Sequence, residues 1–175
     1  EGVVGSGDRT RGVFFAGDGS PENVDIQHVT FTTTGDATDF GNNTGGTHTL
    51  GAGFQNSTRS GVAGGSGSTQ QIDVITTQSS GVSNDFGDMV DGRGGLAGAS
   101  SPTRGLFFGG YKTPSPSAID RIEYVTTSTG GNAADFGDLT QAGYFHGAGS
   151  NSVRAVIGSR QQVPSVLNTI DYVTM

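Results

Sequence analysis

The sequence predicts an all-β protein, a β-propeller of four repeats, and three observations support this prediction. Four sequence patterns return in one order along the 175 residues. Short apolar segments alternate with turn-forming residues, and glycine alone supplies 32 positions. No segment shows the 3.6-residue periodicity of an amphipathic helix. Repeats of about 40–50 residues built from short strands are typical of propellers, in which each repeat forms one blade.

The first pattern is an arginine followed by an apolar run that ends in small residues. Such a run predicts a short strand, here called strand a. A planar guanidinium at one repeat position predicts a structural bridge to carboxylates or carbonyls of a neighbouring blade. A ring of arginines that binds an anion is the alternative. The positions are Arg11, Arg59, Arg104 and Arg154, at spacings of 48, 45 and 50 residues.

The second and third patterns follow each arginine strand. Residues 26–30, 72–76, 122–126 and 170–174 alternate with period two and are rich in β-branched side chains, which predicts strand b. An Asp-Phe-Gly element comes next, with its phenylalanine expected in a structural role. Its aspartate is expected to accept backbone N–H groups in a turn, and a Ca²⁺ site is the alternative. The pairs are Asp39 and Phe40, Asp85 and Phe86, and Asp135 and Phe136.

The fourth pattern is a run of small residues, strand c, which precedes each arginine. The first such run lies at residues 3–7, before any strand a, and the last repeat reaches Met175 directly after strand b. We therefore expect one domain over 1–175, a four-bladed propeller closed by its N-terminal strand. A window on a longer array is the alternative. The repeats would be 11–58, 59–103, 104–153, and 154–175 together with 1–10.

Composition excludes several classes of protein. No run of about 18 apolar residues exists, so we expect no membrane insertion. A net charge of −7 argues against binding to nucleic-acid phosphates. The absence of cysteine excludes disulfides and thiolate chemistry.

The candidate catalytic and metal-binding residues are sparse. His48 and His146 fall in strand c of two repeats, and His28 lies apart from them. Because a metal site needs three or four convergent ligands, we expect these histidines to be hydrogen-bonded near the channel, with no metal and no cofactor. No serine lies on a strand-to-helix turn, and repeat-related carboxylates fall in different blades. We therefore expect no enzyme.

Length variation marks the expected binding surface. The isoleucine of strand b precedes the aspartate of Asp-Phe-Gly by 13 residues each time, whereas the distance from the arginine to that isoleucine is 15, 13, 18 or 16. The variable segments are the a–b loops at 17–23, 65–71, 110–118 and 159–167. Insertions in repeat folds collect on one face, often the binding face. The residues expected to face a partner are Asp18, Glu22, Tyr111, Lys112, Gln161 and Gln162.

The patterns resemble the kelch repeat, which has a glycine doublet after an apolar strand, then an alternating strand and a short aromatic element. Residues 64–65 and 109–110 match the doublet, residues 16–17 and 158–159 depart from it, and the usual tryptophan is absent. More closely, residues 103–110, 122–127 and 131–139 are similar to kelch-like repeats of structural proteins from marine tailed phages, notably those that infect cyanobacteria.

This resemblance implies a non-enzymatic component of an extracellular virion, such as a tail-fibre, tail or capsid-surface protein. An oligomer in the particle is compatible with it. The expected partners are other virion proteins. Recognition of a host receptor, either glycan or protein, is the alternative, and a secreted kelch-like lectin is a third. Contact through the a–b loops is the expected mechanism in each case.

Overall fold

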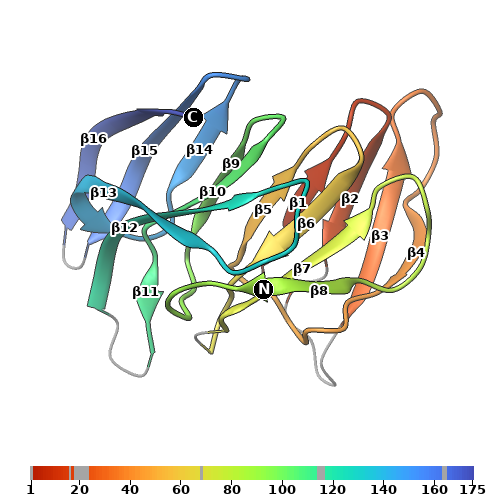
Figure 1. Ribbon diagram of the computed structural model, residues 1–175, viewed down its shortest axis with the longest axis horizontal. Helices are drawn as coiled ribbons and strands as arrows, with labels where there is room; N and C mark the ends of the chain where they lie inside the picture. The colour runs from red at the N-terminus through yellow and green to blue at the C-terminus, as the bar shows by residue number, and fades with distance from the viewer. Residues whose placement is uncertain (1, 16, 18–23, 68, 114–116, 163–164) are drawn as a thin grey trace.

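The computed structural model describes residues 2–15, 17, 24–67, 69–113, 117–162 and 165–175. Within them all regular structure is β, and no helix is present that could cross a membrane. The strands form four antiparallel sheets, arranged as the four blades of a β-propeller (Figure 1). The predicted all-β propeller is therefore confirmed.

Each blade runs in the order c, a, b, and the first three blades add an Asp-Phe-Gly strand. The third blade also carries a two-residue strand that pairs with strand b. Blade one comprises β1 (Val4–Gly7), β2 (Arg11–Phe15), β3 (Asp25–Thr30) and β4 (Thr38–Asn42); blade two β5 (Ala52–Gln55), β6 (Arg59–Ala63), β7 (Gln71–Thr76) and β8 (Asn84–Asp88); blade three β9 (Ala97–Ser100), β10 (Arg104–Phe108), β11 (Tyr111–Lys112), β12 (Ser117–Thr126) and β13 (Ala134–Gly143); and blade four β14 (Gly147–Ser150), β15 (Arg154–Gln162) and β16 (Ser165–Thr174).

The N-terminal strand does not close the ring. β1 pairs with β2, from Val4 opposite Phe15 to Gly7 opposite Gly12, so it belongs to blade one. The prediction that residues 1–10 complete the last blade was wrong, because β14 already pairs with β15 there. The tight turn between β1 and β2 closes a very short loop, and short loops cost little entropy. Hence the chain forms the local hairpin.

Apolar side chains between neighbouring blades form the core. Successive side chains along strands a and b point to opposite faces of the sheet, so each blade has one face toward the preceding blade and one toward the following blade. We call these the leading face and the trailing face. One cluster fills each of the three junctions between consecutive blades: Val4, Val13, Phe15, Ile26, Phe40, Val62 and Ile75; then Ala52, Phe54, Ala63, Ile72, Val74, Phe86, Met89, Leu96, Phe107, Val125 and Ala133; then Ala97, Ala99, Leu106, Phe108, Ile122, Leu139, Ala155 and Ile157.

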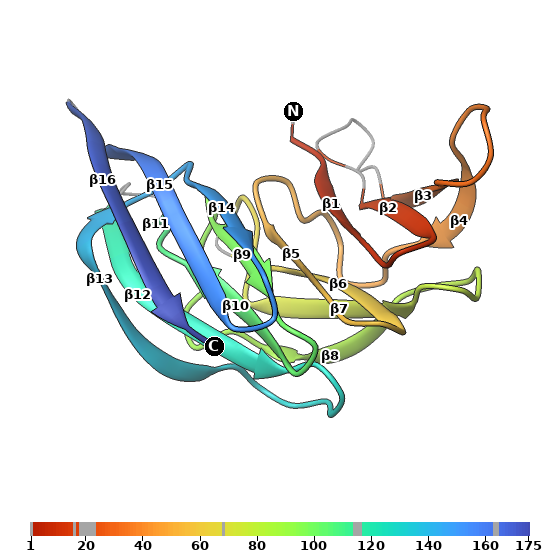
Figure 2. The ribbon, with the colours of Figure 1, turned by 90° about the horizontal axis from the view of Figure 1, so that it is seen from above.

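The inner strands approach one another closely because glycine occupies the contact position. β1 lies against β5, β5 against β9 and β9 against β14. A Cβ atom on Gly53 would overlap the carbonyl oxygen of Gly5, and one on Gly98 would overlap that of Gly53. Figure 2 shows these strands side by side along the concave side of an arc of blades. The small-residue pattern thus sets the spacing of the blades.

The Asp-Phe-Gly strands join consecutive blades through the backbone. The Phe40 carbonyl accepts a 2.7 Å hydrogen bond from the N–H of Gly81 in blade two, and Phe86 accepts the same bond from Gly131 in blade three. Each strand carries a bulge where its glycine takes positive φ. Asp39 and Asp85 accept the N–H two residues on, at 3.0 and 2.9 Å. They therefore bind backbone at a bulged strand rather than in a turn.

Two buried pairs of ionisable side chains make contacts within single blades. His48 Nε2 lies 2.9 Å from Asp73 Oδ2, and Arg93 Nη2 lies 3.2 Å from Glu123 Oε1, with all four side chains inaccessible to solvent. His48 Nδ1 also lies 2.6 Å from the Gly64 carbonyl. Each pair ties the segment before an inner strand to strand b of the same blade.

The histidines therefore differ from the sequence prediction. His48 lies in the segment before β5 rather than in an inner strand, and it is buried beside Asp73. His146 lies before β14, with its Nε2 atom 2.8 Å from the Gly143 carbonyl. His28 lies in β3 and stacks edge-on against Phe40. Among the described residues no three His, Cys, Asp or Glu side chains form a group suited to a metal ion.

Arg93 tests the buried pairs. Burial raises the pKa of Glu123 even though the Arg93 guanidinium opposes it. We predict that Arg93→Ala, which removes the buried counter-charge of Glu123 and leaves it only the partly exposed Arg121 at 3.9 Å, lowers the free energy of unfolding by about 3 kcal/mol. The double variant Arg93→His with Glu123→Asp copies the pair of the preceding blade and should recover part of this loss. Urea unfolding followed by circular dichroism measures the free energy of unfolding of both variants. Equal values for Arg93→Ala and the parent chain would contradict the prediction.

Candidate binding groove

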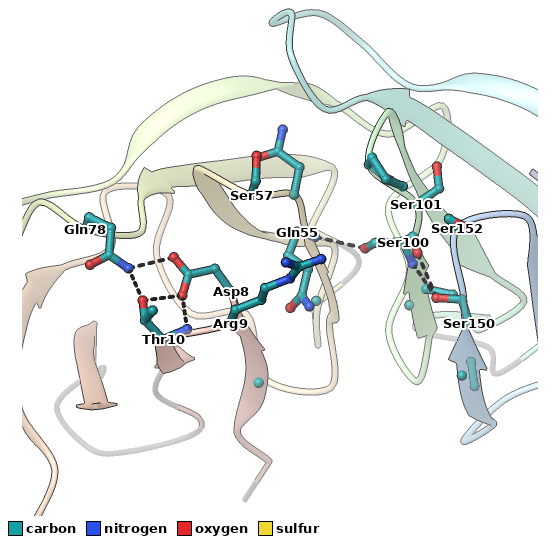
Figure 3. A pocket seen from close by; sticks show the side chains of 18 residues that line it. Asp8, Arg9, Thr10, Gln55, Ser57, Gln78, Ser100, Ser101, Ser150 and Ser152 are labelled. Carbon is teal, nitrogen blue, oxygen red and sulfur yellow. Dashed lines mark hydrogen bonds between the residues drawn. The ribbon is translucent and has the colours of Figure 1, made fainter. Parts of the chain in front are cut away.

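A groove of about 1000 Å³ opens on the concave side of the arc. Its floor is made by the inner strands β1, β5, β9 and β14, and its rim by the turns that connect each inner strand to strand a (Figure 3). All four blades contribute lining residues. The groove is therefore a product of the repeat, and each blade adds one similar strip of surface to it.

One side chain holds each rim turn in shape. An Asp, Asn or Ser stands three residues before each repeat arginine, and its side-chain oxygen accepts the backbone N–H groups two and three positions further on, at 2.7–3.4 Å. Side-chain caps of this kind substitute for backbone bonds in tight turns. The capping residues are Asp8, Asn56, Ser101 and Asn151.

The first rim turn is also tied to blade two. Gln78 Nε2 donates to Asp8 Oδ2 at 2.6 Å and to Thr10 Oγ1 at 2.7 Å. Burial raises the pKa of Asp8, but the bonds from Thr10, Arg11 and Gln78 outweigh it and lower the pKa to about 2. Asp8 is thus a carboxylate at all ordinary pH values. The side chain of Arg9 extends into the groove beside it (Figure 3).

Hydroxyl groups connect the inner strands along the floor. Ser6 Oγ donates to the Phe54 carbonyl at 2.6 Å, and Ser150 Oγ donates to the Ser100 carbonyl at 2.8 Å. Ser100 Oγ in turn accepts the Gln55 N–H at 2.9 Å. Among the described lining residues, Asp8 and Arg9 are the charged ones and none is aromatic. The surface thus offers hydroxyls, amides and backbone groups for hydrogen bonding to a polar ligand.

Four of the six sequence-predicted contact residues, Tyr111, Lys112, Gln161 and Gln162, lie at the opposite end of the blades, because strand a runs from the groove rim to the a–b loop. Tyr111 and Lys112 form β11. Lys112 Nζ lies 2.9 Å from Asp91 Oδ1, and Arg121 pairs with the same carboxylate. The hydrogen bond from Lys112 is the main cause that lowers the pKa of Asp91, and burial opposes it. The Tyr111 ring packs edge-on against Tyr144, at 5.2 Å between centroids.

Gln161 and Gln162 are exposed in β15, opposite Val166 and Ser165 of β16. The predicted loop at 159–167 was wrong in extent, because β15 and β16 continue through most of it as a long hairpin. The predicted loop at 110–118 likewise includes β11 and the start of β12. The remaining two predicted contact residues, Asp18 and Glu22, lie outside the described residues.

The repeat arginines frame the rim. Arg11 Nη1 donates to the Thr77 carbonyl of blade two at 3.2 Å, and Arg59 Nη1 donates to the Thr127 carbonyl of blade three at 3.3 Å. These are the inter-blade carbonyl bridges expected at this position. Arg104 and Arg154 instead stack over tyrosine rings, Tyr124 at 4.9 Å and Tyr172 at 4.7 Å.

The sequence prediction missed the groove residues, although the signal was present. Asp8, Asn56, Ser101 and Asn151 all stand three residues before a repeat arginine, and Asp, Asn and Ser are the side chains that cap tight turns. The prediction ranked surfaces by length variation, and the rim turns are constant in length. Constant length here reflects the cap.

Comparison with known proteins gives no indication of function. No protein-family model matches the chain, and no curated protein has a similar sequence. The kelch-like and phage-like resemblance therefore remains a hypothesis based on the repeat patterns.

Asp8 tests the rim. We predict that Asp8→Ala removes the cap and lowers the free energy of unfolding by about 1 kcal/mol, the usual loss for one capping side chain. Asp8→Asn should stay close to the parent chain, because Asn56 and Asn151 cap the equivalent turns. Thermal unfolding at neutral pH measures both variants, and equal losses for alanine and asparagine would contradict the capping role.

The stability difference between the parent chain and Asp8→Asn should also depend on pH. Since the pKa of Asp8 is about 2 in the folded chain and 3.8 without these bonds, its contribution to stability is complete above pH 4. That contribution is lost as the pH falls from about 4 to about 2. The difference in stability between the parent and Asp8→Asn should therefore change over this window and stay constant above it. A constant difference throughout would contradict an ionised, hydrogen-bonded Asp8.

Proposed function

We propose that the chain is a non-enzymatic binding module of a virion, which docks a polar segment of another virion protein in the groove. The single observation that carries the proposal is the groove itself, to which every blade contributes. Its virion setting is supported by the resemblance of the repeats to phage structural proteins. A rigid scaffold with short, capped turns loses little conformational entropy on binding, which favours such a role.

The groove has the chemistry for an extended polar chain. Arg9 and Gln55 project into it from neighbouring blades, and both can donate to carbonyl or carboxylate oxygens (Figure 3). Asp8 offers a carboxylate that accepts N–H groups. With opposite charges close together, a docked segment is fixed in position by charged hydrogen bonds, which are the strongest available here.

Recognition of a host-surface glycan is the second candidate. It is favoured by the hydroxyl- and amide-bearing lining, which matches the donors and acceptors of sugar hydroxyls. The opposite end of the blades, with Tyr111, Lys112, Gln161 and Gln162, then provides a second contact surface to the particle. In this second candidate the groove binds the glycan, and the opposite end of the blades binds the particle.

Four single variants separate these functions. Arg9→Ala and Gln55→Ala alter the groove, whereas Tyr111→Ala and Gln161→Ala alter the opposite end. We predict that Arg9→Ala lowers the amount of the chain incorporated into particles by about tenfold, as expected for the loss of a charged hydrogen bond. Quantitative immunoblotting of purified particles measures incorporation.

The outcomes are distinct. Full incorporation of the groove variants with loss of adsorption to host cells would replace docking with receptor recognition. Loss of incorporation only with Tyr111→Ala and Gln161→Ala would move the docking surface to the opposite end. Normal incorporation and adsorption for all four variants would overturn the proposed function.

A further inference from the structure

The arc of blades ends in two uncovered faces. The three apolar clusters fill the junctions between consecutive blades, and among the described residues no cluster joins blade four to blade one. Figure 2 shows these two blades at opposite ends of the arc. Within the described part of the chain, the leading face of blade one and the trailing face of blade four therefore lack the neighbour that the other blade faces have.

Blade one exposes the residues that its equivalents bury. The third residue after the repeat arginine is buried against the preceding blade in Val62, Phe107 and Ile157, but the corresponding Phe14 is 40% exposed. Phe31 directly follows strand b, its ring lies over Gly12 on the same face, and it is 60% exposed. Two phenylalanines on one leading face are a costly exposure for a soluble surface unless a partner covers them.

Blade four exposes the complementary set. The first isoleucine of strand b is fully buried against the following blade in Ile26, Ile72 and Ile122, but Ile170 is 70% exposed. Tyr172 on the same face is 65% exposed, and Val156 of strand a is also exposed. These exposed residues occupy the same repeat positions as residues of the first three blades that are buried against the following blade.

The inner strand of blade one also has room for a neighbour. Gly53 and Gly98 are the glycines that permit close approach of the preceding inner strand. Gly5 stands at the same position of β1, and a Cβ atom on it would meet nothing within 4 Å. A close-approach glycine beside open space fits one more inner strand on that side.

We propose that these faces are one interface, and that its occupant is a second copy of this chain. The trailing face of each copy packs on the leading face of the other, so that Val156, Ile170 and Tyr172 cover Phe14 and Phe31. Two such contacts close a ring of two four-bladed chains. Head-to-tail contacts form a ring when their rotation closes, and eight blades lie within the range of propellers.

The repeat also predicts the polar contact of this interface. Arg11 and Arg59 each donate to a carbonyl of the following blade, five residues after the first isoleucine of its strand b. In the ring the following blade for Arg154 is blade one of the other copy. Its acceptor is therefore the Phe31 carbonyl, which Arg154 reaches by leaving the Tyr172 ring. β14 of one copy then lies beside β1 of the other, and the groove becomes a channel.

Sedimentation equilibrium on the chain gives the first test. We expect twice the mass of the chain, dissociating only on dilution. A single-chain mass at every concentration up to the solubility limit would overturn the proposal. A mass that continues to grow with concentration would overturn the closed ring, because it would show head-to-tail contacts that do not close.

Phe14→Asp and Ile170→Asp test the faces. Each should give a single-chain mass with an unchanged circular dichroism spectrum, because each side chain is exposed in one chain. Val82→Asp is the matched control, since Val82 is 60% exposed on the β7–β8 turn, away from both faces, and should stay a dimer. Unchanged dimers in either face variant would overturn the proposal.

A mixture identifies the head-to-tail arrangement. Tagged Phe14→Asp chain retains an intact trailing face, and untagged Ile170→Asp chain retains an intact leading face. We expect the mixture to pair through this one intact contact, so that the tag retains the untagged chain, whereas neither variant pairs with itself. No pairing in the mixture would exclude the head-to-tail contact. These masses do not depend on any ligand, so the test stands apart from that of the docking function.

Discussion

The burial of apolar sheet faces between consecutive blades is the constraint on which the structure depends. A blade of three or four short strands has too little apolar area to be stable alone. Strands a and b meet this constraint through their two-residue period. In the first junction, Val13 and Ile26 of blade one pack against Val62 and Ile75 of blade two. The glycines of the inner strands and the Phe40 carbonyl then fix how closely and at what angle the blades meet.

The groove follows from the same constraint. Because the inner strands are narrow and the blades fan out, their short connecting turns come together on the concave side. Internal caps hold these turns, because the side-chain oxygen of each capping residue accepts two of their backbone N–H groups. Asp8 and Gln78 show how a cap also reaches the next blade. Shape and polarity of the groove are thus consequences of blade packing.

Strand positions were predictable because their signals are local. The alternation at 72–76 and the run after Arg104 define β7 and β10 without tertiary information. The partner of β1 was not predictable from the same signals, because strand c has the same small residues in every repeat and fits beside any strand a. The pairing of His48 with Asp73 and of Arg93 with Glu123 was also hidden, since each pair joins residues 25 or more positions apart with different side chains. The groove required knowledge of which turns share a side.

The capped rim turns separate stability from specificity. The residue at the start of each turn holds the backbone, whereas the next position, occupied by Arg9, Ser57, Pro102 or Ser152, lines the groove without that duty. Charged, hydroxyl and cyclic side chains all occur there on one backbone design. Such positions accept new chemistry without a refolding cost, so a protein of this kind is evolvable: its ligand preference can drift through four independent sites while the scaffold stays unchanged.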